Sequence, residues 1–421
     1  MPSFIHAADI HLDSPLRGLA NYEGAPVDAI GGATRRAFET LIDLAIERHV
    51  AFVLLAGDLY DGDWKDYNTG LFFNRQMARL DREGIRVFVV SGNHDAQSKI
   101  TRFLRPPSNT YVYGSKRPDT VILQDLGVAI HGQSYTTAAV REDLASGYPE
   151  PSVGILNIGL LHTSLDGRPG HEPYAPCSID TLRAKGYQYW ALGHVHTREV
   201  VSSDPYILFP GCIQGRHIRE SGVKGCSLVS YEGGEILQVE HYPLDVVRWV
   251  QCYVSLDAVT TEQALTEAVH GALSDALDEA DGRLIAVRLL FNGATTLHTD
   301  LQSDPAHFEN LVRTVAVEID EELIWIEKVR FQTSAVRAME DVLAQGSPLS
   351  SVLRAIVEFP TSVKDGGRLS DELSLLKNKL PRELFEGDRV GSLDDPTVIK
   401  DIVNDAKEHL LARLLTEGDD K

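Results

Sequence analysis

The chain has 421 residues, 43% of them hydrophobic and 24% charged, with a formal net charge of −21. This length predicts two or three domains, and the composition is typical of a soluble globular protein. The net negative charge weighs against a nucleic-acid partner without excluding one, because it is unevenly distributed. Residues 1–250 hold 23 Lys and Arg against 29 Asp and Glu, whereas residues 251–421 hold 17 against 32.

Targeting signals and cysteine pairs are both missing from the sequence pattern. The opening MPSFIHAADIHLD has no basic segment before an apolar run, and no later apolar stretch approaches the roughly 20 residues of a membrane span. We therefore expect a cytoplasmic protein with no membrane partner. Its four cysteines are widely spaced without a C-x-x-C motif, which favours reduced structural thiols over a disulfide framework or a thiolate zinc site.

The N-terminal part alternates between predicted strands and helices. Strands are expected at 3–9, 51–58 and 85–90, with helices at 34–49 and about 66–83 between them. Further strands follow in quick succession, separated by Gly and Pro, at 128–132, 155–162, 187–194, 206–211, 226–231 and 236–242. The pattern predicts an α/β domain of two packed sheets flanked by helices, spanning residues 1–245.

A second alternation begins after this domain. Strands at 247–256, 283–291 and 323–331 enclose helices at about 261–279 and 305–319, which predicts a small α+β domain over residues 246–334. Residues 335–421 carry only helical patterns. In the last of them Ile399, Val403, Ala406, Leu410 and Leu414 share one face, which would pack on neighbouring segments or bind a partner.

Five predicted strands of the first domain end in side chains that can bind metal. In chain order these are Asp9 and His11, Asp58, the run Gly92-Asn93-His94-Asp95, His162, and His194 with His196. Period two places both members of each D-x-H or H-x-H pair on one side of the chain. The Gly-Asn-His-Asp run alone would also suit an ordinary turn, but the recurrence at five strand ends indicates a metal site.

The donor types restrict which metals would bind. Asp, Asn and His ligands without Cys suit Mn²⁺, Fe or Zn²⁺ better than Ca²⁺ or an iron–sulfur cluster. Seven donors exceed what one ion needs, so two divalent ions are expected. Asp58 is the natural bridge between them, because a carboxylate has two oxygens to share.

The ordered motifs D-x-H, GD, GNHD, H and G-H-x-H across residues 9–196 resemble the calcineurin-like metallophosphoesterases. The resemblance implies a four-layer α/β/β/α sandwich, followed here by the α+β capping domain and C-terminal helices. It implies one metal held by Asp9, His11, Asp58 and His196, and another held by Asp58, Asn93, His162 and His194. His94 would meet the phosphate or protonate the leaving oxygen. Asp95 would orient His94 or stabilise the turn.

Two phrases, IHAADIHLDSPLRG and FPGCIQGRHIRESGVKGCSLV, resemble bacterial DNA-repair exonucleases of the SbcD and YhaO type. That resemblance implies manganese-dependent cleavage of DNA, 3′ to 5′ on duplex ends and endonucleolytic on single strands. It also implies a separate coiled-coil ATPase partner, since no G-x-x-x-x-G-K-[ST] occurs in the chain. A homodimer through helices of the catalytic domain is a family expectation. Some relatives have His where this chain has Asp61, which leaves a phosphate-steering role at that position in doubt and suggests a supporting one.

The substrate has alternatives at this point. Lys99, Arg102, Arg105, Arg216, His217, Arg219 and Lys224 would line a phosphodiester track or form ordinary solvated surface. A small-molecule or cyclic-nucleotide phosphodiesterase or phosphatase of the same fold is the main alternative to a nuclease. A binding subunit without catalysis is a third, and the intact ligand set counts against it.

Overall fold

The computed structural model describes residues 1–14, 26–61, 67–97, 106–167, 173–257, 259–335, 348–358, 400, 403–407 and 410. The chain divides into two compact units. The first comprises Met1–Gln251, Ala276–Val287 and Glu322–Glu327, and the second comprises Cys252–Asp275, Arg288–Glu321 and Lys328–Lys421. Among the described residues, no helix is long and apolar enough to cross a membrane.

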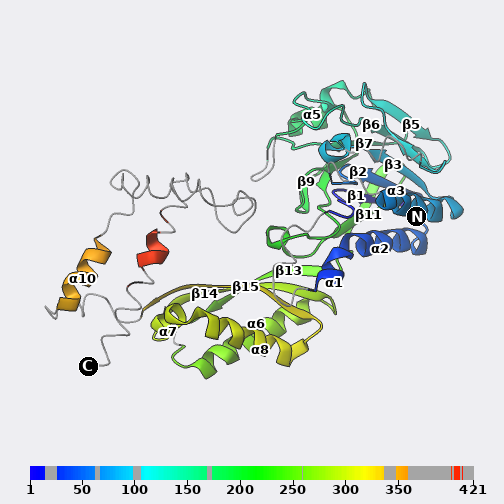
Figure 1. The fold of residues 1–421 in the computed structure, drawn as a ribbon. Coiled ribbons are helices and arrows are strands. Elements are labelled where there is room, and N and C mark those ends of the chain that lie inside the picture. The colour runs from blue at the N-terminus through cyan, green and yellow to red at the C-terminus, as the bar shows by residue number, and fades with distance from the viewer. Residues whose placement is uncertain are drawn as a thin grey trace. The chain divides into compact units, whose positions relative to one another are not determined.

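Two six-stranded sheets form the framework of the first unit (Figure 1). One has the order β12 (Glu235–Pro243), β11 (Gly225–Glu232), β1 (Ser3–Ala7), β2 (Phe52–Ala56), β3 (Arg86–Val90) and β4 (Thr110–Val112). The other has the order β5 (Asp119–Leu123), β6 (Val128–Gly132), β7 (Leu156–His162), β8 (Tyr189–Gly193), β10 (Tyr206–Phe209) and β9 (Glu199–Ser203).

Successive residues of the central strands point to opposite faces of their sheets, so the two sheets border three hydrophobic cores. In β2, Val53 and Leu55 pack with residues of helices α2 (Ala33–Glu47) and α3 (Tyr67–Arg82), whereas Phe52, Leu54 and Ala56 pack between the two sheets. In β8, alternate residues face the core between the sheets and a third core that includes Leu182 of α5 (Ile179–Ala184). The order is therefore helix, sheet, sheet, helix, and the expected α/β/β/α sandwich is confirmed.

Strand direction explains why polar motifs meet at one edge. β1, β2 and β3 are parallel to one another, as are β6, β7 and β8 in the other sheet. The carboxyl ends of each group therefore lie at the same edge of its sheet. A short helix, α4 (Asn93–Gln97), starts directly after β3 and carries the Asn-His-Asp run.

The strands and helices of the C-terminal half also follow the expected alternation. A three-stranded sheet has the order β13 (Val247–Ser255), β14 (Leu284–Thr295) and β15 (Ile324–Ala335). The helices are α6 (Glu262–Glu279), α7 (His298–Ser303), α8 (Pro305–Asp320) and α10 (Pro348–Val357). Asp304 caps α8 by accepting from the backbone N–H of His307, and Pro305 occupies its first turn. Most of the predicted terminal helix lies outside the described residues.

Candidate metal centre

The chain leaves β1 and β2 through two paired turns that carry three of the predicted ligands. The backbone N–H of Asp9 donates to Gly57 O at 3.0 Å, and that of His11 donates to Asp58 O at 2.9 Å. Glycines allow this close approach: a Cβ on Gly57 would lie 2.5 Å from His162 Nδ1, and one on Gly92 would lie 2.3 Å from Asp58 Oδ1. The glycines of the GD and GNHD motifs therefore make room for the neighbouring side chains.

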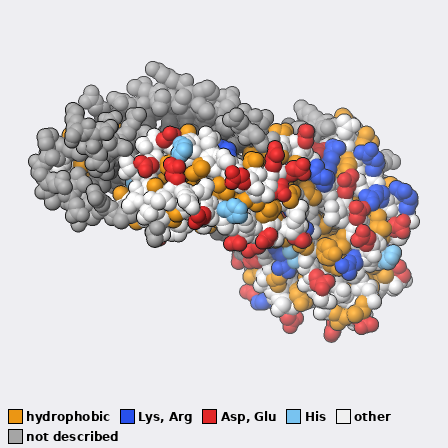
Figure 2. Space-filling view, turned by 90° about the horizontal axis from the view of Figure 1, so that it is seen from below, with side chains coloured by type: hydrophobic (Ala, Val, Ile, Leu, Met, Phe, Trp, Pro, Cys, Tyr) orange, Lys and Arg blue, Asp and Glu red, His pale blue; other side chains and the backbone are white. Residues whose placement is uncertain are grey.

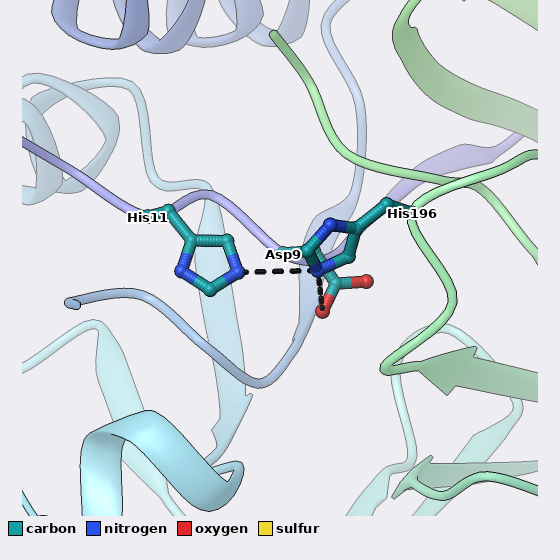
Figure 3. Close-up of side chains that lie close together, drawn as sticks. All are labelled: Asp9, His11 and His196. Carbon is teal, nitrogen blue, oxygen red and sulfur yellow. Dashed lines mark hydrogen bonds and ion pairs between the residues drawn. The ribbon is translucent and has the colours of Figure 1, made fainter. Parts of the chain in front are cut away.

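Asp9, His11 and His196 form the first group of donors (Figure 3). His11 Nε2 lies 3.3 Å from His196 Nε2, and the latter lies 3.9 Å from Asp9 Oδ1. The Asp9 carboxylate accepts from the backbone N–H of His194 through both oxygens, at 3.1 and 3.0 Å. One nitrogen of each ring and a carboxylate oxygen thus converge from the segments that follow β1 and β8.

Asp58, His162 and His194 form the second group, and Asn93 joins it. His162 Nε2 lies 3.5 Å from Asp58 Oδ2 and 3.0 Å from Asn93 Oδ1. Its other nitrogen, Nδ1, is 2.9 Å from Ala56 O. A carbonyl oxygen can only accept, so Nδ1 donates to Ala56 O. In a neutral ring this leaves the Nε2 lone pair facing the Asp58 and Asn93 oxygens, an arrangement that a cation between these groups would stabilise.

Asp58 lies between the two groups. The same Oδ2 that approaches His162 is 3.9 Å from His11 Nε2, while Oδ1 accepts from the backbone N–H of His94 at 2.9 Å. The seven predicted metal-ligating residues are therefore brought together at one edge of the two sheets.

The electrostatics of the site suit a cation. Burial raises the pKa of the Asp9 carboxyl to about 7; His196 opposes this shift and Asp58 adds to it. The pKa of the His11 ring is lowered to about 3, chiefly by burial and to a smaller extent by the positive charge of Arg216. A divalent cation would favour ionised carboxylates and neutral imidazoles, and these are the ligand forms that bind metal. The donor set therefore fits the metal that its motifs predict.

His94 has a carboxylate partner, but it is Asp61 rather than Asp95. His94 Nδ1 is 2.9 Å from Asp61 Oδ1, and this hydrogen bond raises the pKa of the ring above its usual range. The His94 side chain is 38% exposed, compared with 21% for His196. Asp61 Oδ2 also accepts from Ser14 Oγ at 2.7 Å.

Asp95 stabilises the turn instead. Its two oxygens accept from the backbone N–H groups of Tyr60 and Gly92, at 3.0 and 3.1 Å. Of the two roles expected for Asp95, the hydrogen bonds match the second and give no support to the first. The supporting role suggested for Asp61 agrees with its position.

Two of the basic residues expected near the site form hydrogen bonds within the protein. Arg216 binds Glu220 through Nη2 at 2.8 Å, and buried Lys224 donates to His196 O at 3.4 Å. His217 and Arg219 are exposed. Lys99, Arg102 and Arg105 lie outside the described residues. The structure therefore supports only part of the expected basic track.

Glu220 was missed by the sequence analysis. Its Oε1 lies 2.6 Å from His196 Nδ1, although 24 residues separate them. Burial alone would raise the pKa of Glu220, but the hydrogen bond from His196 and the charge of Arg216 hold it well below its usual range. No local motif marks this residue.

Asp, Asn and His side chains thus gather at the carboxyl ends of strands in an α/β/β/α sandwich, an arrangement that suits metal-dependent hydrolysis of phosphoesters. The model for the calcineurin-like phosphoesterase family matches residues 2–198, and that for the middle domain of metallophosphoesterase YhaO matches residues 249–334. The chain is 36% identical over 295 residues to the uncharacterized metallophosphoesterase YhaO of Bacillus subtilis, covering 69% of this chain and 72% of that protein. It belongs to the calcineurin-like phosphoesterase family.

Nucleases are among the more distant relatives. Identity is 28% over 270 residues with the DNA double-strand break repair protein Mre11 of Sulfurisphaera tokodaii, covering 58% of this chain and 62% of that protein. With the SbcD component of the nuclease SbcCD of Escherichia coli K12 it is 22% over 256 residues, covering 51% of this chain and 64% of that protein. The chain thus spans slightly less than two thirds of these two relatives. The expected likeness to nucleases of this type is confirmed at the level of homology.

Proposed function

We propose that this metallophosphoesterase is a DNA nuclease that hydrolyses phosphodiesters at a centre of two divalent ions, with manganese as the metal. The observation that carries the proposal is the convergence of Asp9, His11, Asp58, Asn93, His162, His194 and His196 at one edge of the sandwich. The homology to Mre11 and to SbcD supports DNA as the substrate. The expected polarity is 3′ to 5′ on duplex ends, with endonucleolytic cleavage of single strands.

The two groups of donors suggest how the ions would be held. One position would take Asp9, His11, Asp58 and His196, and the other Asp58, Asn93, His162 and His194. When bound, two such ions supply Lewis acidity and neutralise the phosphate charge that develops during in-line displacement. The protein contributes rigid donors on strand ends whose separation is fixed by the two sheets.

His94 is the catalytic residue of the proposal. Asp61 accepts from Nδ1, so the ring is held with Nε2 as the nitrogen that can reach a substrate. In this position His94 would bind the phosphate or give a proton to the leaving oxygen. Asp61 would set the orientation of the ring, and Asp95 would fix the turn that carries it.

A second candidate function is hydrolysis of a small-molecule or cyclic-nucleotide phosphodiester. The observation that favours it is that Arg216 and Lys224 are engaged within the protein. Figure 2 also shows Lys and Arg side chains interspersed with Asp and Glu on the face in view. A short substrate would need few contacts outside the metal centre, whereas DNA requires a longer basic surface.

The deciding experiment measures manganese-dependent degradation of end-labelled duplex and single-stranded DNA, beside a cyclic-nucleotide substrate. We expect DNA cleavage by the native protein and loss of at least about 100-fold in His94→Ala, with its metal content unchanged. Intact DNA together with hydrolysis of the cyclic nucleotide would favour the second candidate. Loss of metal from His94→Ala would contradict the role given to His94.

We also propose a partner and a division of labour along the chain. Residues 1–245 would form the nuclease domain, 246–334 the capping domain, and 335–421 the helical region that binds a separate coiled-coil ATPase. The match of residues 249–334 to the YhaO middle domain supports a distinct middle segment. We further propose that the protein is a homodimer located in the cytoplasm.

A further inference from the structure

A buried ion pair lies behind His196, on the side of the ring away from Asp9 and His11. Glu220 belongs to the short 3-10 helix η4 (Ile218–Glu220), and its side chain is only 5% exposed. Arg216 binds it with three groups: the backbone N–H and Nε to Oε2 at 2.8 and 3.3 Å, and Nη2 to Oε1 at 2.8 Å. The carboxylate is therefore fixed in position and neutralised within the protein.

The remaining strong contact of this carboxylate is to His196. Glu220 Oε1 lies 2.6 Å from Nδ1, and a carboxylate that already accepts from an arginine has no hydrogen to give. Nδ1 of His196 therefore carries the hydrogen, and Nε2 presents its lone pair toward Asp9 and His11. The Glu220 contact thus fixes both the orientation of the ring and the nitrogen available to a metal.

His196 requires such support more than its neighbours do. Its side chain is 21% exposed, whereas His11 and His162 are almost completely buried and are confined by packing. The corresponding nitrogen of His162 is held by a backbone carbonyl, which no substitution removes. At His196 this task falls to a charged side chain 2.6 Å from Nδ1 that a substitution can remove, whereas the carboxylate described beside Nδ1 of His11, that of Asp61, lies 3.7 Å away.

We propose that Glu220, held in place by Arg216, is the positioning residue for His196 and selectively sets the affinity of one of the two metal positions. The inference rests on the proposed function, because it assumes that His196 is a ligand. It extends that function because Glu220 would set the metal affinity of one position and not of the other. The position with Asp9, His11 and His196 depends on Glu220, and the one with His162 and His194 does not.

The test is a titration of the full-length metal-free protein with Mn²⁺, following free Mn²⁺ by electron paramagnetic resonance. For the native protein we expect two ions. Glu220→Ala should weaken one of them by about 10- to 100-fold and leave the other unchanged. Glu220→Gln keeps the size of the side chain and an acceptor oxygen. In this variant the affinity for the weakened ion should lie between that of the native protein and that of Glu220→Ala. Glu262→Gln is the matched control, since exposed Glu262 contacts His307 at 3.2 Å, and should bind as the native protein does.

A second readout needs neither metal nor turnover. In nitrogen-15 spectra of the histidine rings, the Nδ1–H signal of His196, identified by its loss in His196→Ala, should move in Glu220→Ala and not in Glu262→Gln. Two ions bound with native affinity in Glu220→Ala would overturn the inference alone, as would equal weakening of both or an unmoved His196 signal. Absence of Mn²⁺ binding by the native protein would overturn the proposed function and the inference with it.

Discussion

Four of the seven candidate ligands have left-handed backbone conformations that side-chain-bearing residues rarely adopt. The φ angles are 51° at Asp9, 46° at His11, 52° at Asp58 and 108° at His194. Each such residue costs of order 1–3 kcal/mol, and this cost persists only where the surrounding structure imposes it. Here the paired turns after β1 and β2 and the hydrogen bonds to Asp9 impose it. Strain is thus concentrated on the residues that carry the proposed chemistry.

The sequence predicted which residues meet, because their positions follow from strand ends and short spacings. Asp9 and His11, and likewise His194 and His196, are close in the chain and share one side of it. It could not predict Glu220 or the Asp61–His94 contact, which depend on how distant loops pack. The Asn-His-Asp run suggested Asp95 as the partner of His94, but α4 turns that carboxylate toward backbone N–H groups.

Replacing Asp61 tests the role of His94 as a proton donor. Asp61→Ala should lower kcat at least about tenfold on DNA, whose leaving oxygen needs a proton, with KM nearly unchanged. On bis(p-nitrophenyl) phosphate, whose leaving group departs without protonation, the effect should be small. In a protein that already carries His94→Ala, adding Asp61→Ala should not lower the activity further. A loss of equal size on both substrates would contradict a role through the leaving group.

Among the helices and strands, the continuous apolar runs of the central strands were the most informative pattern. β1, β2, β3, β7 and β8 were predicted because buried strands between two cores are apolar on both faces. The short strands β4, β5 and β9 were missed. All three lie at sheet edges, where exposure allows polar residues and weakens the pattern.

A buried ion pair at the start of β13 provides a stability test within the first unit. Arg248 donates to Asp245 through Nε and Nη2 at 2.8 and 3.2 Å, and both residues are buried. Asp245→Ala should reduce the free energy of unfolding by about 3–5 kcal/mol, because Arg248 would remain buried without its partner. Denaturant titration measures the loss.

The control for that substitution is an exposed pair of the same kind. Arg86 contacts Asp125 at 2.7 Å, and Asp125 is 64% exposed. Asp125→Ala should cost less than about 1 kcal/mol, since solvent screens the interaction. Similar losses for the two alanine variants would show that burial does not determine the strength of these pairs.

At the scale of the whole molecule, every candidate ligand belongs to the first compact unit and the C-terminal region to the second. Removal of residues 340–421 should therefore leave Mn²⁺ binding unchanged and abolish association with the proposed coiled-coil ATPase. Metal analysis and co-purification with the co-expressed ATPase measure the two effects. Unchanged association in the truncated protein would contradict the proposed docking region.

Anomalous diffraction at the manganese edge would locate the ions of the dinuclear centre proposed at the five strand ends. Crystals equilibrated with Mn²⁺ should show two peaks, one among Asp9, His11, Asp58 and His196 and the other among Asp58, Asn93, His162 and His194. Asp58 should contact both. A single peak at this edge, or manganese bound elsewhere in the chain, would contradict the account.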